Sequence, residues 1–99
     1  MHIMGDHVPF RPENLDRAPD SPGVYLLETR RETVYFGESR DSVRSRLRQH
    51  LAGQAGDCTQ KATHFRAEAH GRPIARLREL LREHLRAFGR IPECNDSIP

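Results

Sequence analysis

The sequence of 99 residues contains no tryptophan, a single lysine, two cysteines and no long run of apolar residues. A transmembrane helix needs about 20 consecutive apolar residues, so we expect no membrane partner. Cys58 and Cys94 are too few and too widely spaced for a disulfide framework or a zinc knuckle, so we expect free thiols. The first residues lack the basic and apolar segments of a signal peptide, and the expected location is therefore the cytoplasm.

What the sequence does contain describes one small folded domain. Hydrophobic residues make up 35% of the chain and charged residues 30%, which is typical of a globular protein with a single core. A net charge of +2 is too small to predict nucleic-acid binding by itself. All but one of the 16 basic residues are arginine, a bias that fits bidentate phosphate recognition and equally fits a GC-rich genome.

The segment Thr33–Leu51 has the strongest local pattern. Its first four residues are β-branched or aromatic and predict a strand that ends at Gly37. Asp41 and Ser42 then offer N-cap side chains for a helix that Gly53 can close. The segment therefore predicts a strand, a turn and a helix in direct succession.

The predicted helix has one apolar stripe and two polar shoulders. Its stripe consists of residues four positions apart: Val43, Leu47 and Leu51. Arg46 and His50 fall on one shoulder, and Arg44 and Arg48 fall on the other. One shoulder can therefore line a cleft while the stripe packs against the core.

An earlier strand, Gly23–Glu28, is expected to pair with the strand that begins at Thr33. Matching the apolar faces places Tyr25 opposite Tyr35 and leaves a three-residue loop at Thr29–Arg31. Both phenols then lie on one face of the sheet. Two opposed tyrosines can also be a stabilising cross-strand pair without a chemical role.

The remaining segments complete an α/β pattern of the α+β type. Residues 1–20 are expected to form an irregular N-terminal arm, and residues 21–99 the domain. Residues 52–63 read as a loop without recognisable chemistry, and Thr63–His70 alternates as a third strand with an exposed polar face. A helix is expected from Pro73 to Gly89, and its apolar stripe comprises Ile74, Leu77, Leu80, Leu81, Leu85 and Phe88. We expect a small three-stranded antiparallel sheet flanked by helices.

Three features in this order resemble the GIY-YIG nuclease superfamily: the triplet GVY at Gly23–Tyr25, the triplet YFG at Tyr35–Gly37, and an arginine-bearing helix that ends near a histidine. The resemblance covers roughly residues 21–95. It implies a divalent-metal-dependent endonuclease whose site lies on one face, between the hairpin, the first helix and the last helix.

The resemblance also implies a metal ligand near the C-terminus. Family members use one glutamate that commonly precedes a Pro-x-x-Asn ending by nine and twelve residues, and Pro92 and Asn95 lie at those distances from Glu83. Glu83 is therefore the expected ligand of one Mg2+ or Mn2+ ion, and Glu79 is the alternative. A hard cation of this kind needs only one or two carboxylates, completed by water and substrate phosphate.

By the same resemblance, Tyr25 and Tyr35 are the two family tyrosines, one of which takes the proton from the attacking water. Arg46 would bind the scissile phosphate, and His50 would assist proton movement. The stretch from Gly37 to Arg46 is one residue longer than usual, so Arg44 is the alternative arginine. The remaining assignments are four nucleic-acid-binding arginines, Arg40, Arg44, Arg46 and Arg48, and two supporting residues, Gly37 and Asn95.

The expected function is hydrolysis of phosphodiester bonds in DNA, structure-selective or low in sequence specificity, in repair, recombination or mobile-element biology. RNA stays open as a substrate, because nothing in the sequence identifies a contact with a 2′-hydroxyl. A protein partner could supply targeting. The alternative function is a non-catalytic nucleic-acid-binding or interaction module that keeps the fold.

Overall fold

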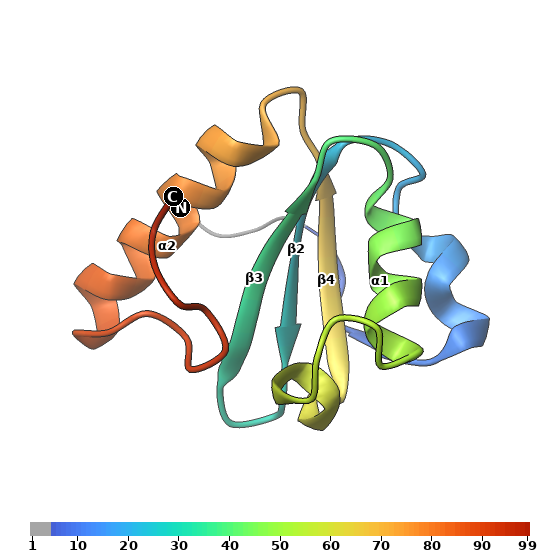
Figure 1. The fold of residues 1–99 in the computed structure, drawn as a ribbon, viewed down its shortest axis with the longest axis horizontal. Helices are drawn as coiled ribbons and strands as arrows, with labels where there is room; N and C mark the ends of the chain where they lie inside the picture. Colours follow the sequence, from blue (N-terminus) through green and yellow to red (C-terminus); the bar gives the residue numbers. More distant parts are fainter. Residues whose placement is uncertain (1–4) are drawn as a thin grey trace.

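The computed structural model describes residues 5–99 as one sheet with a helix on each side (Figure 1). The elements in chain order are β1 (Val8–Pro9), the 3-10 helix η1 (Pro12–Arg17), β2 (Gly23–Glu28), β3 (Thr33–Ser39), α1 (Val43–Leu51), the 3-10 helix η2 (Cys58–Lys61), β4 (His64–Ala69) and α2 (Pro73–Phe88). The strands are antiparallel in the order β1-β4-β2-β3. This arrangement confirms the α+β class, with four strands instead of the expected three.

The additional strand belongs to the segment expected to be an irregular arm. Val8 and Pro9 pair with the start of β4, and η1 follows directly. A strand of two residues that includes a proline has no periodicity, which is why the sequence pattern missed it. The expectation of an irregular arm is therefore wrong at β1 and η1, and residues 1–4 of this arm lie outside the described part of the chain.

The two helices cover opposite faces of the sheet (Figure 1). Successive side chains of a strand point to opposite faces, so Tyr25 and Leu27 pack with α1, whereas Val24 and Leu26 pack with α2. The sheet is flanked by helices as expected, but the expectation of a site on one face between the hairpin and both helices is wrong, because the two helices lie on opposite faces. Any site that uses residues of α1 and α2 must reach around an edge of the sheet.

The β2–β3 hairpin keeps the predicted faces but not the predicted register. Tyr25 pairs with Gly37, and Leu27 pairs with Tyr35, a displacement of two residues from the expected alignment. The turn at residues 29–32 is closed by the N–H of Thr29, which donates to Glu32 O at 2.9 Å, and the register shifts at Leu27/Glu28. The strand continues through Gly37 to Ser39, so this glycine does not end it.

The helix bounds agree closely with the sequence. The Ser42 side chain caps α1 by accepting from the N–H of Ser45, and Gly89 at φ 76° ends α2. The apolar stripe of α2 is shorter than expected, because Leu85 is 41% and Phe88 is 70% exposed. The last turn of α2 therefore extends beyond the core. No helix within residues 5–99 is long and apolar enough to cross a membrane.

The C-terminal segment runs along the outer edge of β3. The N–H of Cys94 donates to Val34 O at 3.1 Å. The side-chain amide of Asn95 accepts from the N–H of Phe36 and donates to its carbonyl oxygen, both at 2.9 Å. The Asn95 amide thus satisfies the hydrogen-bonding groups of Phe36 in the edge strand, as the backbone of a neighbouring strand would.

A disulfide joins Cys58 of η2 to Cys94, 36 residues later in the chain. The expectation of free thiols is wrong, because folding around β4 and α2 brings together two residues that are distant in sequence. Both cysteines lie next to residues that contact the hairpin or α1, so the bridge ties η2 to the β3 edge.

Replacing both cysteines by serine is expected to lower the free energy of unfolding by roughly 2–4 kcal/mol, since a cross-link of this span restricts the unfolded chain. Urea unfolding of the oxidised wild type, the reduced wild type and the double serine variant measures the effect. The reduced wild type serves as the control and should match the serine variant. Equal stability of oxidised and reduced protein would contradict the prediction.

Candidate active site

The four site residues expected on the hairpin and the first helix lie together on the α1 side of the sheet. The ring of Tyr25 lies 6.2 Å from that of Tyr35 and 5.4 Å from that of His50, measured between centroids. The rings of Tyr35 and His50 are 5.5 Å apart. Arg46 lies one helical turn before His50, and its charge acts on the Tyr25 hydroxyl. The structure thus brings Tyr25, Tyr35, Arg46 and His50 into one cluster, which we call the tyrosine cluster.

The two phenols differ in exposure. Tyr25 is completely buried, and its hydroxyl is 2.7 Å from Nε2 of His50. Burial raises the pKa of Tyr25 above its ordinary value, and the charges of Tyr35 and Glu38 act in the same direction against the opposing effect of Arg46. Tyr35 is only half-buried. Tyr35 is therefore the phenol that solvent or substrate can reach.

Gly37 makes room for the buried phenol. A Cβ atom at this position would lie 2.3 Å from the Tyr25 hydroxyl oxygen and 2.2 Å from its Cζ. Because Gly37 is paired with Tyr25 across the hairpin, any other residue would force the ring out of place. The supporting role expected for Gly37 therefore has a steric cause.

His50 is buried at the end of α1 and is bonded on both ring nitrogens. Nε2 contacts the Tyr25 hydroxyl, and Nδ1 is 3.0 Å from Oγ1 of Thr59 in η2. Burial, with a smaller contribution from the Arg46 charge, lowers the pKa of His50 to about 4. The imidazole is therefore neutral at pH 7 and has one lone pair that can accept a proton.

The buried histidine makes stability depend on pH. In the unfolded chain a histidine binds a proton near pH 6.5, whereas folded His50 binds one only near pH 4. The unfolded state therefore holds more protons in this window, and stability should fall by up to about 3 kcal/mol between pH 6.5 and 4. Urea unfolding at several pH values measures the slope.

The variant His50→Gln should flatten this dependence. His70→Gln is the matched control, because His70 follows β4 and lies outside the tyrosine cluster. A slope that is the same in His50→Gln and the wild type would contradict the prediction.

Two residues of the tyrosine cluster's surroundings were missed by sequence reasoning. Thr59 is buried against His50, and the side-chain amide of Gln60 donates to His50 O at 2.6 Å. Both lie in η2, within the stretch that was expected to be a loop without chemistry. The sequence gives no signal for the role of Thr59, because a threonine in a polar segment is usually an ordinary surface residue.

The arginines of α1 divide between structure and site. Arg44 donates to Ala18 O at 3.1 and 3.0 Å and to Asp16 O at 3.1 Å, which ties η1 to α1. Arg46 is a member of the tyrosine cluster, and it donates to the side chain of Gln49 at 2.8 Å. Of the two alternatives for the phosphate-binding arginine, the geometry favours Arg46. Arg40 and Arg48 are exposed on the surface.

Glu83 lies on the other side of the sheet. Its side chain lines a cavity of about 420 Å³ between α2 and the sheet, together with Leu26 and Phe36. Those two residues belong to the face opposite Tyr25. The structure therefore does not place the expected metal ligand in the tyrosine cluster. Asn95 holds the backbone of Phe36 at the β3 edge, between the two faces.

A second candidate carboxylate lies in the edge strand β3. Glu38 follows Gly37 in β3 and pairs with Val24, so its side chain points to the α2 face, but its charge still acts on Tyr25. Its Oε2 is buried and has no hydrogen-bond partner within residues 5–99. A buried carboxylate oxygen without a donor is unusual and suits contact with a cation. Glu38 therefore competes with Glu83 as a ligand, although no sequence pattern selected it.

The donor set fits a hard divalent cation. The described residues contain no group of three or more His, Cys, Asp or Glu side chains that could hold a metal by themselves. A single glutamate completed by water and phosphate is nevertheless the usual arrangement for Mg2+. The α2 face also holds Arg76, which is 3% exposed and pairs with Glu68 at 2.7 Å. The hydrogen bond to Glu68 is the main reason that the pKa of Arg76 is raised, and the charge of Glu83 contributes.

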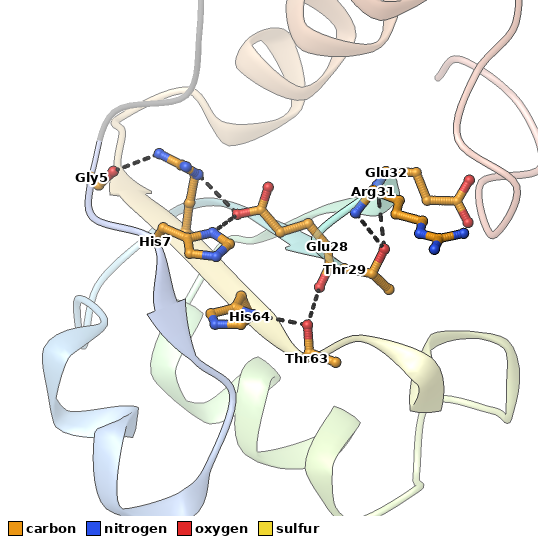
Figure 2. A network of polar contacts seen from close by, with 9 residues as sticks. Gly5, His7, Glu28, Thr29, Arg31, Glu32, Thr63 and His64 are labelled. Atoms are coloured by element: carbon orange, nitrogen blue, oxygen red, sulfur yellow. Dashed lines mark hydrogen bonds and ion pairs between the residues drawn. The ribbon is translucent and has the colours of Figure 1, made fainter.

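A separate polar network occupies the far end of β2 (Figure 2). The Glu28 carboxylate contacts His7 at 2.6 Å and accepts from Arg66 at 2.9 Å, while Arg66 also donates to Gly5 O. This network ties the segment before β1 to the sheet. The β4 face expected to be exposed is therefore half-buried at Arg66.

Fold and tyrosine cluster together define a small α+β domain of the nuclease type. Residues 21–77 match the family described as the GIY-YIG catalytic domain, and the chain belongs to this family. The match includes Tyr25, Tyr35, Arg46 and His50, and it ends before Glu83 and Asn95. A search of curated proteins finds no match. GIY-YIG domains are nucleases that generally depend on a divalent metal, so the substrate of the chain is a nucleic acid.

Proposed function

We propose that the chain is a divalent-metal-dependent endonuclease that hydrolyses phosphodiester bonds in DNA with little sequence specificity. The observation that carries the proposal is the contact between His50 and the Tyr25 hydroxyl, beside a second phenol and an arginine. An in-line displacement needs a base for the attacking water and a cation for the phosphoryl oxygens. The tyrosine cluster offers both.

Tyr35 is the proposed proton acceptor, because it is the half-buried phenol and Tyr25 is completely enclosed. The proposed phosphate ligand is Arg46, whose planar guanidinium can bind two phosphoryl oxygens. Tyr25 and His50 form the buried support behind these two groups. Mg2+ or Mn2+ would be held by Glu83, or by Glu38 as the alternative, and would polarise the phosphate when bound.

The proposed site straddles the edge strand β3. Tyr35 and Phe36 are neighbours in this strand and point to opposite faces, so only the thickness of one strand separates the α1 side from the α2 side. A phosphate at the Gly37–Ser39 end of β3 would lie beyond the part that Asn95 covers. This placement allows one substrate to meet residues of both faces.

Affinity is expected to come mainly from phosphate contacts and to fall with salt, because a chain of this size offers little surface for reading bases. Structure-selective cleavage, a role in repair, recombination or mobile elements, and a targeting partner belong to the same proposal. A cytoplasmic location is also proposed. Structural disulfides are rare in the reducing cytosol, so the redox state of Cys58 and Cys94 in cells bears directly on it.

The decisive assay measures cleavage of supercoiled, branched and single-stranded DNA, and of RNA, with Mg2+, with Mn2+ and with a chelator. The proposal predicts cleavage of at least one DNA substrate that requires the metal. Binding without cleavage under all conditions would instead support the non-catalytic module. Cleavage of RNA but of no DNA substrate would contradict DNA as the substrate and indicate a ribonuclease.

A further inference from the structure

The 3-10 helix η2 meets the tyrosine cluster through a single buried side chain, that of Thr59. We propose that Thr59 is a positioning residue: its hydroxyl oxygen accepts the Nδ1 hydrogen of His50 and thereby keeps the Nε2 lone pair directed at the Tyr25 hydroxyl. The effect on cleavage rests on the proposed function. The tautomer of His50 is a property of the free protein, so that part of the inference does not depend on the proposed function.

The direction of the hydrogen bonds follows from the arginine. A guanidinium carries a positive charge and only donates, so the Tyr25 oxygen presents a lone pair, and not its hydrogen, toward the Arg46 charge. The Tyr25 hydrogen then needs an acceptor of its own, and Nε2 of His50, at 2.7 Å, is the one that residues 5–99 provide. Nε2 must therefore be unprotonated, which places the imidazole hydrogen on Nδ1.

Thr59 is the acceptor for that Nδ1 hydrogen. Its Oγ1 lies 3.0 Å from Nδ1, and Thr59 is 4% exposed, so water cannot easily take its place. The opposite tautomer would direct Nε2–H at the Tyr25 oxygen and turn the Tyr25 hydrogen toward the Arg46 cation. With Thr59 as the acceptor, the hydrogens that Arg46, Tyr25 and His50 Nδ1 direct along this chain of contacts each have an acceptor.

Covalent and polar contacts hold η2 in this place. The preceding residue, Cys58, is bridged to Cys94, and the following residue, Gln60, bonds to the carbonyl of His50. The charged or titratable groups around His50 come from the other elements: Tyr25 from β2, Tyr35 from β3 and Arg46 from α1. The two η2 residues that contact His50, Thr59 and Gln60, are neutral, so they can select a tautomer without adding charge beside the ring.

The test compares Thr59→Val with Thr59→Ser, since valine keeps the shape and serine keeps the hydroxyl. Nitrogen-15 NMR of the histidine ring should show wild-type and serine-variant His50 protonated on Nδ1, and the valine variant shifted toward Nε2. Cleavage should fall about 100-fold or more in the valine variant, because the wrong tautomer of His50 displaces the Tyr25 hydroxyl that supports Tyr35 and Arg46, and it should stay within about threefold of wild type with serine.

Thr63→Val is the matched control within the same chain. Thr63 Oγ1 contacts Nδ1 of His64 at 2.8 Å in an exposed threonine–histidine pair (Figure 2), and neither residue belongs to the tyrosine cluster. This variant should change neither the His50 signals nor cleavage.

Wild-type His50 protonated on Nε2 would overturn the inference without any variant, even if valine at position 59 prevented folding. An unchanged tautomer in Thr59→Val would overturn it as well. A wild type that cleaves nothing but shows Nδ1–H would refute the proposed function and leave the hydrogen-bond assignment supported.

Discussion

Replacing Glu83 by glutamine is expected to reduce DNA cleavage by about 1,000-fold or more while the affinity for DNA changes by less than about threefold. A neutral amide is a weaker ligand than a carboxylate for the divalent cation that Glu83 is proposed to hold, and charge stabilisation by such a cation is worth several kcal/mol. Affinity should persist because arginine–phosphate contacts supply most of it. Single-turnover cleavage with Mg2+ and equilibrium binding with a chelator measure the two quantities separately.

Two further glutamates make this prediction discriminating. Glu79 is exposed one helical turn before Glu83 and lies 3.7 Å from Arg76, so Glu79→Gln should be nearly silent. Glu38→Gln is the sharper comparison, because the charge of Glu38 acts on Tyr25. Loss of cleavage in Glu38→Gln, together with normal cleavage in Glu83→Gln, would indicate that Glu38 of β3 is the metal ligand. Normal cleavage in all three variants would contradict a carboxylate-held metal.

The two tyrosines should respond differently to loss of their hydroxyls. Tyr35→Phe is expected to slow cleavage by roughly 100- to 1,000-fold, the usual contribution of a proton-transfer group. The unfolding free energy of this variant should not change, because the Tyr35 hydroxyl makes no hydrogen bond within residues 5–99. Single-turnover cleavage and urea unfolding of the same preparation test both statements.

Tyr25→Phe is the paired variant. It leaves Nε2 of His50 buried without its partner, so we expect a loss of about 1–3 kcal/mol in unfolding free energy in addition to slower cleavage. Full activity of Tyr35→Phe would refute Tyr35 as the proton acceptor. A large loss of stability in Tyr35→Phe, with none in Tyr25→Phe, would contradict the observed burial of the two side chains.

Local chemistry was predictable from the sequence, because each signal needed only neighbouring residues. Pro73 and Gly89 bounded α2 correctly, and Ser42 capped α1 as expected. The alternation in β2 predicted that Tyr25 and Tyr35 share a face. Side-chain parity survives a two-residue change of register, so this part of the site was correct although the pairing itself was wrong.

Long-range contacts were not predictable from the same signals. The register depended on how Thr29 closes the turn and on a shift at the end of β2, neither of which is visible in hydrophobic periodicity. The face covered by each helix depends on the crossover of the chain, which placed Glu83 on the side opposite Tyr25. The Cys58–Cys94 bridge and the Thr59–His50 contact likewise join segments that carry no local pattern.

The way the sheet ends on either side affects how the protein behaves at high concentration. At one side the last strand is β1, only two residues long and half of it proline. At the other side the Asn95 amide and the Cys94 N–H occupy polar backbone groups of Val34 and Phe36. Exposed strand edges are the usual starting points for aggregation and for intermolecular sheet extension. One edge strand is short, and the other is covered by the C-terminal segment. The two edges therefore offer a second copy of the protein few free backbone groups with which to pair.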